Sequence, residues 1–176
     1  MKRLKTMLFF VLSLAVSFAS HADNKITFTG KVIDSACKIT VNGGTSSLDL
    51  GETAATDIAA KGQTGAPKTF AVSLAACPAA GAGVPTKAYV KFSGTTDGDD
   101  TYFKNDLTEN AATNVAVQIK DASGKAIANN DGNNAIVLPT AGGDLNLEYT
   151  ASLVASAATP TKGDVSATVT YTVSYE

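Results

Sequence analysis

The sequence predicts an all-β protein, built as a sandwich of two sheets. Three observations carry this prediction. Short runs in which apolar and polar residues alternate, the pattern of a strand with one buried face, recur along the chain. Turn-forming Gly, Asn, Asp and Pro residues separate these runs. Beyond residue 22 there is no run with helical periodicity, and no repeat or linker divides the chain, so we expect one domain.

The first 22 residues have the pattern of a secretory signal peptide. Basic residues precede an apolar stretch at 7–19, which is short for a membrane span. Small residues at Ser20 and Ala22 predict cleavage before Asp23, and an uncleaved anchor is the alternative. Removing 22 of the 176 residues leaves 154, a size that supports one domain with a hydrophobic core.

Cleavage also changes the charge and the chemistry of the chain. It removes three of the 14 basic residues and none of the 16 acidic ones, which leaves a net charge of about −5. No basic stripe remains, so nucleic acid is not an expected partner. The only histidine, His21, leaves with the signal peptide, and with it the usual triads and proton shuttles. We therefore predict that the protein is not an enzyme; a secreted hydrolase that uses carboxylates alone is the remaining enzymatic alternative.

Two cysteines, Cys37 and Cys77, remain in a chain that is expected to be exported. Such a pair most simply forms one disulfide, whereas a structural zinc site needs four nitrogen or sulfur ligands. The acidic cluster at 97–100 lacks the glycine and the closing glutamate of a calcium loop, so it predicts a solvated turn. No phosphate-binding or dinucleotide motif is present, and no cofactor is expected.

In chain order, the alternating runs predict strands at 23–32, 32–41, 48–50, 70–77, 88–92, 115–120, 136–138 and 145–153, before a last one at 165–175. Residues 51–67, 78–85 and 95–114 are expected to be loops. Gly30 is unusual in the first run, because glycine weakens a strand unless a neighbouring group comes close. An ordinary first strand of the domain is the alternative interpretation of that run.

The last run is the clearest strand in the sequence. Its apolar face consists of the odd-numbered residues Val165, Ala167, Val169, Tyr171, Val173 and Tyr175. Serine and threonine occupy the positions between them. The sequence supplies no further strand after Glu176, so we expect an open sheet edge, and open edges bind other chains.

Together and in order, these features resemble the pilin subunits of chaperone–usher fimbriae of the type 1 kind. The resemblance spans the whole predicted mature chain. It is carried by the alternating segment with Ile26, Phe28, Gly30 and Val32, the pair Cys37 and Cys77, the run 115–119 with the turn 121–124, Gly163 fourteenth from the end, and the penultimate Tyr175. Loops rich in Ala, Thr and Gly, and Lys162 before Gly163, depart from the usual pattern.

The resemblance implies an immunoglobulin-like β-sandwich that lacks its seventh, carboxyl-terminal strand and is completed by a donor strand from a neighbouring subunit. It divides the chain into a signal peptide (1–22), a donor-strand extension (23–32) and a pilin domain (33–176). The donor residues are Ile26, Phe28, Gly30 and Val32. The acceptor groove, which also binds the chaperone, is assigned to Gly163, Val165, Ala167, Val169, Tyr171, Val173 and Tyr175.

The resemblance also implies the function and the partners. We expect a structural subunit, the major shaft pilin, that polymerises by donor-strand exchange and serves adhesion. Its partners are other pilin subunits in a head-to-tail homopolymer, a periplasmic chaperone and an outer-membrane usher, and its location is the fimbrium at the cell surface. A single-domain minor subunit, which is a tip adaptor or itself binds a receptor, is the alternative.

Overall fold

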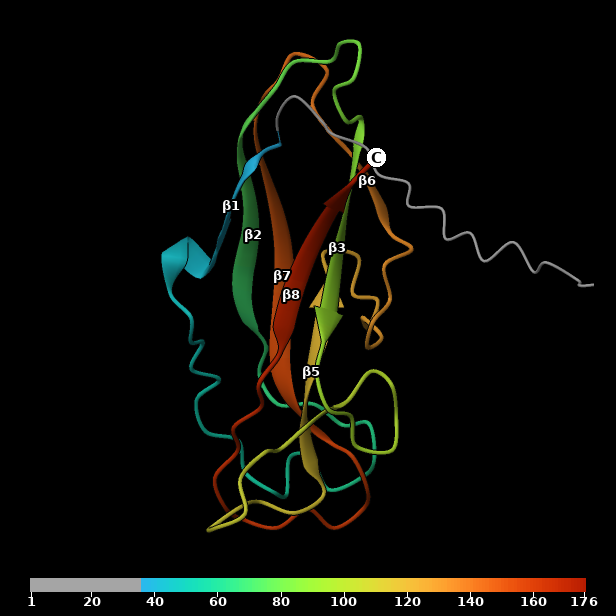
Figure 1. Cartoon of the computed structure of the whole chain (residues 1–176). Coiled ribbons are helices and arrows are strands. Elements are labelled where there is room, and N and C mark those ends of the chain that lie inside the picture. Colours follow the sequence, from blue (N-terminus) through green and yellow to red (C-terminus); the bar gives the residue numbers. More distant parts are fainter. Residues whose placement is uncertain (1–35) are drawn as a thin grey trace, which may run out of the picture. The chain divides into compact units, whose positions relative to one another are not determined.

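The computed structural model of the chain describes residues 36–176 (Figure 1). The predicted signal peptide and the predicted donor segment lie outside these residues. The described part consists of eight strands and one short 3-10 turn, η1 (Asn42–Gly44). It contains no helix with the length and apolar character needed to cross a bilayer.

The strands form two antiparallel sheets. The larger sheet has the order β1-β2-β7-β5-β4, with β1 at Lys38–Val41, β2 at Lys68–Cys77, β7 at Gly143–Ala155, β5 at Val115–Asp121 and β4 at Phe103–Lys104. The smaller sheet has the order β6-β3-β8, with β6 at Ala135–Val137, β3 at Lys87–Ser93 and β8 at Thr170–Tyr175. One hydrophobic core draws side chains from both sheets, which confirms the predicted all-β sandwich.

The core is built from the buried faces of the alternating strands. On β2 the side chains of Val72 and Leu74 are fully buried, while their neighbours in the sequence are not. Three aromatic rings join the sheets: Tyr149 of β7 lies 5.6 Å from Phe70 and 5.1 Å from Phe92 of β3, measured between ring centroids. Such offset and edge-on contacts add to the stabilisation that comes from burial alone.

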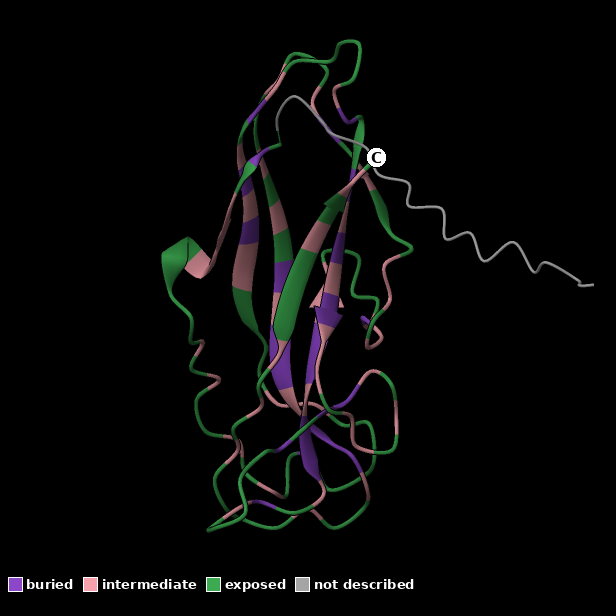
Figure 2. Ribbon diagram, viewed as in Figure 1, coloured by how far each residue is buried: buried purple, intermediate pink, exposed green. Residues whose placement is uncertain are grey.

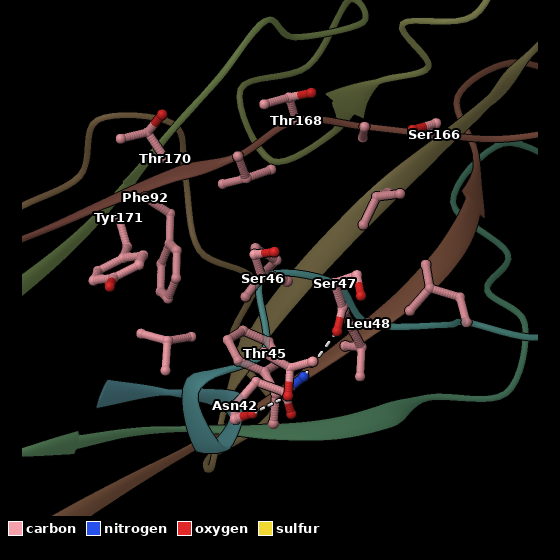
Figure 3. A pocket seen from close by; sticks show the side chains of 18 of the residues that line it. Asn42, Thr45, Ser46, Ser47, Leu48, Phe92, Ser166, Thr168, Thr170 and Tyr171 are labelled. Atoms are coloured by element: carbon pink, nitrogen blue, oxygen red, sulfur yellow. Dashed lines mark hydrogen bonds between the residues drawn. The ribbon is translucent and has the colours of Figure 1, made fainter. Parts of the chain in front are cut away.

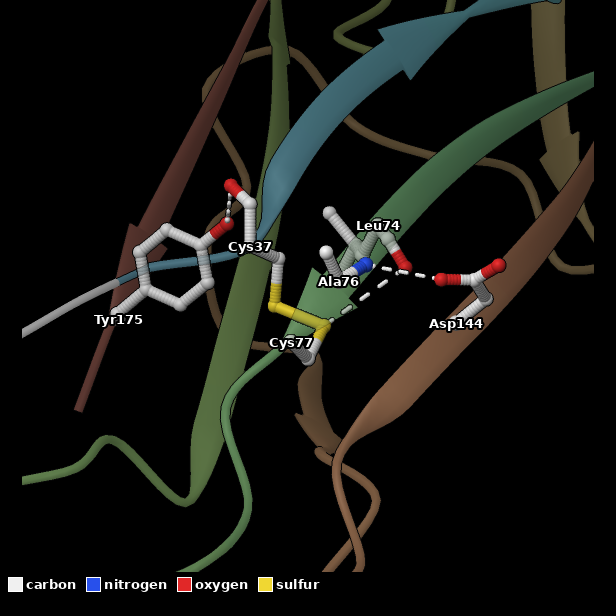
Figure 4. Close-up of a disulfide and its surroundings, with 6 residues drawn as sticks. All are labelled: Cys37, Leu74, Ala76, Cys77, Asp144 and Tyr175. Carbon is white, nitrogen blue, oxygen red and sulfur yellow. Dashed lines mark hydrogen bonds between the residues drawn. A yellow bond between two sulfur atoms is a disulfide. The ribbon is translucent and has the colours of Figure 1, made fainter.

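The predicted disulfide between Cys37 and Cys77 is confirmed, and it joins the segment before β1 to the end of β2 (Figure 4). The Tyr175 hydroxyl donates a hydrogen bond to the Cys37 carbonyl oxygen (3.4 Å), so the end of β8 is tied to the same corner. Burial raises the pKa of Tyr175, which keeps this hydroxyl protonated as a donor. A β-bulge precedes Cys77, and there the Ala76 N–H donates to Oδ1 of Asp144 (2.8 Å).

One predicted strand and one predicted loop are wrong. Residues 48–50 form no strand, because no neighbouring strand pairs with them. The stretch 95–114, predicted to be a loop, contains β4, which pairs with β5 through Phe103 and Lys104 alone. A two-residue strand is too short to show an alternating pattern. The Phe103 side chain is fully buried, so this short strand is a firm part of the core.

Candidate functional site

A large groove opens between β1 and the loop that follows it on one side and the last strand of the chain on the other (Figure 3). Its volume is about 890 Å³. The floor is the apolar interior of the sandwich, formed by Phe70, Phe92, Val117, Ile119 and Ala151. The groove therefore reaches the core, where Phe70 and Val117 stay half-buried.

The last strand forms one wall of the groove, and its side chains alternate as the sequence predicts. Val165, Ala167, Val169, Val173 and Tyr175 are half-buried, and the residues between them are exposed. In Figure 2, β8 carries no buried residue, whereas β3 beside it does. The Tyr171 ring lies on the same side as Phe92 in Figure 3 but keeps 42% of its surface exposed. These side chains are half-covered because no strand lies on their far side among the described residues.

The prediction that the strand begins at residue 165 is wrong. The paired strand β8 begins at Thr170, because its partner β3 ends at Ser93 and the chain turns away at Gly94. Residues 165–169 are not assigned to a strand. They still line the groove, and their side chains continue the alternation of β8.

The backbone of this wall presents an unpaired edge to the groove. The backbone groups of even-numbered residues make their hydrogen bonds on the side away from the groove. The Glu176 N–H donates to the Lys87 carbonyl, the Glu176 carbonyl accepts from the Lys87 N–H, and the Ser166 carbonyl accepts from the Asp106 N–H (2.7 Å). In an extended chain, successive residues direct their N–H and C=O groups to opposite sides. The backbone groups of the odd-numbered residues from Val165 to Val173 therefore face the groove.

Gly163 lies where this wall begins, and the packing there has no room for a side chain. A Cβ atom at this position would lie 2.4 Å from the Ala112 nitrogen and 2.6 Å from the Asn110 oxygen, and φ is +154°. Close approach lets the next residue pair with this segment through both of its backbone groups: the Asp164 N–H donates to the Asn110 carbonyl (2.7 Å), and the Asp164 carbonyl accepts from the Ala112 N–H (2.9 Å).

Of the predicted groove residues, the structure brings Val165, Ala167, Val169 and Tyr171 together around the cavity. Gly163, Val173 and Tyr175 belong to the same wall but are not among the residues that line the cavity. The predicted donor residues Ile26, Phe28, Gly30 and Val32 lie outside the described part of the chain.

The opposite wall was not predicted from the sequence. It consists of β1, η1 and the extended segment up to Leu50, with hydroxyl groups from Thr45, Ser46 and Ser47. The turn is held by the Asn42 side chain, whose Nδ2 donates to the Ser47 carbonyl (2.9 Å). Two alternating pairs in the sequence are signals for this wall, Ile39 with Val41 and Leu48 with Leu50, since all four side chains line the groove.

The chemistry of the groove suits a polypeptide segment. None of its lining residues carries a charge, and the polar groups on it are hydroxyls, one amide and backbone. Within residues 36–176 no three His, Cys, Asp or Glu side chains come together as metal ligands. The acidic cluster at 97–100 forms a hydrogen-bonded turn, in which bonds from the Thr101 hydroxyl and N–H lower the pKa of Asp99.

Comparison with known proteins agrees with this geometry. A family model described as "Fimbrial protein" matches residues 26–176. The "Probable major fimbrial subunit LpfA" of Escherichia coli O157:H7 is 32% identical, covering 98% of both chains. The "Minor fimbrial subunit HifD" of Haemophilus influenzae is also 32% identical, over 94% of this chain and 80% of that protein. A solved chain from a chaperone–usher pilus, 24% identical, aligns with a TM-score of 0.66 over 92% of this chain and all of the other, which confirms the immunoglobulin-like fold.

Proposed function

The chain belongs to the family of fimbrial proteins, and from this premise we propose that it is a structural subunit of a chaperone–usher fimbria whose copies join by donor-strand exchange. In this proposal, residues 23–32 of one copy fill the groove of the next. A periplasmic chaperone fills the groove during export, and an outer-membrane usher directs the replacement. The finished fibre lies at the cell surface and serves adhesion.

The observation that carries the proposal is the match between the groove and an extended segment. One wall offers backbone N–H and C=O groups and apolar side chains at alternate residues, and the floor offers apolar surface. Strand addition uses both features: main-chain hydrogen bonds supply affinity, and pockets for alternate side chains supply specificity. The segment 23–32 has the complementary pattern, with Ile26, Phe28 and Val32 on one face and Lys or Thr between them.

Burial of the donor side chains favours the joined subunits. Burying Ile26, Phe28 and Val32 contributes about 1.5–3 kcal/mol each, or about 5–9 kcal/mol before ordering costs. Covering the half-buried Phe70 and Val117 on the groove floor adds to this. The donor segment and the groove lie on the same chain but are used between copies, so the contact is heterologous, and growth gives an open filament instead of a closed ring.

The test compares the predicted mature chain with a self-complemented chain, in which a second copy of residues 23–32 follows Glu176 through an Asn-Gly turn. We expect the self-complemented chain to unfold at a much higher urea concentration and to stay monomeric, while the mature chain forms fibres or captures a synthetic 23–32 peptide. The matched control carries Phe28→Ser in the added copy and should lose most of the gain. A mature chain that unfolds cooperatively and with the same stability as the self-complemented one would contradict the proposal.

We assign the chain to the fibre shaft as the major subunit, and a minor subunit is the second candidate. The second candidate is favoured by HifD, which is called a minor subunit and is as similar to this chain as LpfA is. The number of copies in purified fibres separates them. A shaft subunit makes up most of the fibre mass, whereas a minor subunit is present in a few copies and its deletion leaves the shaft in place.

A further inference from the structure

Within residues 36–176, the first half of the groove wall has no strand beside it after the bridge between Asp164 and Ala111. On the side away from the groove, β3 pairs with β8 from Thr170 onward and ends at Ser93. Residues 164–168 come before that point, yet Val165 and Ala167 line the groove. Asp164 at the start of this segment is bridged to Ala111, but residues 165–168 have no paired strand on either side among the described residues. Such an extended segment loses its conformation readily, because ordering a backbone costs entropy. Other groups must therefore hold this half of the wall.

Asn105 provides the first of these groups. It directly follows β4, and its side chain is buried, with 8% of the residue exposed. Its Nδ2 group donates to the carbonyls of Asp164 (2.9 Å) and Ala112 (3.2 Å). Its Oδ1 atom accepts from the N–H groups of Ser166 (3.0 Å) and Leu107 (3.2 Å). This one amide makes four hydrogen bonds, the full capacity of an Asn side chain.

Asp106 provides the second group. Its N–H donates to the Ser166 carbonyl (2.7 Å), and its Oδ2 atom accepts from the Thr168 N–H (2.7 Å). These bonds reach the same side of the wall that β3 pairs with farther along. Gly94 makes room there, since a Cβ atom on it would lie 2.8 Å from the Thr168 carbonyl oxygen.

We propose that Asn105 and Asp106 are positioning residues of the groove, in which two side chains stand in for the missing strand and hold residues 164–168 extended. We call the pair the Asn105–Asp106 clamp. By engaging the backbone of Asp164, Ser166 and Thr168, the clamp turns the N–H and C=O groups of Val165 and Ala167 toward an incoming segment. The inference rests on the proposed function only for the identity of that segment, a β-strand such as residues 23–32.

The clamp divides the groove wall into two parts with different supports. The part from Thr170 to Tyr175 is held by the ladder with β3 and does not depend on the clamp. The part from 164 to 168 depends on the clamp and, at Asp164, on the bridge to Ala111. A change in the clamp side chains should therefore affect this part alone. The test therefore needs a measurement that separates the two parts.

The test uses the predicted mature chain with Asp106→Ala and Asn105→Ala as disrupting variants. Asp106→Asn is the conservative variant, because its amide oxygen still accepts from the Thr168 N–H. The control is Asp121→Ala: the Asp121 carboxylate also accepts several hydrogen bonds in a turn, from Ser123 and Lys125, but it does not line the groove. Amide hydrogen exchange and binding of a synthetic 23–32 peptide are measured for each.

We expect Asp106→Ala to speed the exchange of the Thr168 amide at least about tenfold, and Asn105→Ala that of the Ser166 amide, with the amides of β8 unchanged. Both variants should release the peptide about tenfold faster or more. Asp106→Asn should restore both properties, and Asp121→Ala should leave both as in the parent chain. Since Asp106 is exposed, its variants keep the test available if Asn105→Ala does not fold.

Unchanged exchange at Ser166 and Thr168, or peptide release that Asp121→Ala speeds equally, would overturn the clamp. The clamp and the proposed function fail in different ways. If the parent chain binds no 23–32 peptide, the proposed function fails, and the exchange rates in the free chain still decide whether the clamp exists. If the parent chain binds the peptide and the clamp variants bind it equally well, the clamp alone is refuted.

Discussion

Replacing Gly163 by alanine places a methyl group against the backbone of residues 110–112. The added Cβ would lie 2.4 Å from the Ala112 nitrogen, 2.5 Å from the Ala111 carbonyl carbon and 2.6 Å from the Asn110 oxygen. These are about 1 Å shorter than ordinary contacts, and backbone atoms cannot rotate away as a flexible side chain can. Overpacking of this kind costs about 1–3 kcal/mol. Loss of the two Asp164 hydrogen bonds beside it adds about 1 kcal/mol each, for a total of about 3–5 kcal/mol.

Urea unfolding of the self-complemented chain measures this cost. The matched control is Gly98→Ala, because Gly98 also has a positive φ (+70°) but nothing lies within 4 Å of its added Cβ. The control should cost only the backbone strain, about 1–2 kcal/mol. A Gly163→Ala variant that loses no more stability than Gly98→Ala would refute the reasoning from close approach.

Four further predictions address other parts of the chain. Reducing the Cys37–Cys77 disulfide, whose cysteines are separated by 40 residues, should lower the free energy of unfolding by about 3–4 kcal/mol in urea titrations with and without reductant; an unchanged midpoint would contradict this. Thr159→Asn should raise stability by about 0.5–1 kcal/mol in thermal unfolding, because Thr159 is β-branched and has φ of +57°; a loss of stability would show that this strain is not relieved. Gly30→Leu should slow or block polymerisation but leave the chaperone-bound monomer intact, and unimpaired fibres would remove the role given to Gly30. Hydrogen bonds, first of all from the Ser123 hydroxyl, lower the pKa of Asp121 in the folded protein. The stability that the Asp121 carboxylate contributes is therefore present above its unfolded pKa of about 4 and is lost as the pH falls through the lower folded value. The Asp121→Asn variant should lose less stability in acid than the parent chain, and identical curves of stability against pH would contradict this.

Local patterns predicted the elements that pair over their full length. The predicted bounds lie within a few residues of the observed ones for β2, β3, β5 and β7. Each of these strands has one face in the core, and the alternation of apolar and polar residues in the sequence reflects that burial. The disulfide also followed from two cysteines in a chain predicted to be exported, a question of compartment that needs no coordinates. Among the described residues, β8 lies at the edge of the smaller sheet.

The sequence by itself thus determined the sandwich, its disulfide and the alternating face of its last strand. Only the tertiary structure decided where β3 stops along that strand and that β1 and the unpaired segment up to Leu50 together form the second groove wall. It also decided that Asn105 and Asp106 support residues 164–168. The physical reason is that alternation reports which side of a strand is buried, whereas pairing depends on what lies beside it. Asn105 lies far from Ser166 in the sequence, and a polar residue in a turn-rich stretch looks the same whether its amide meets water or another segment of the chain.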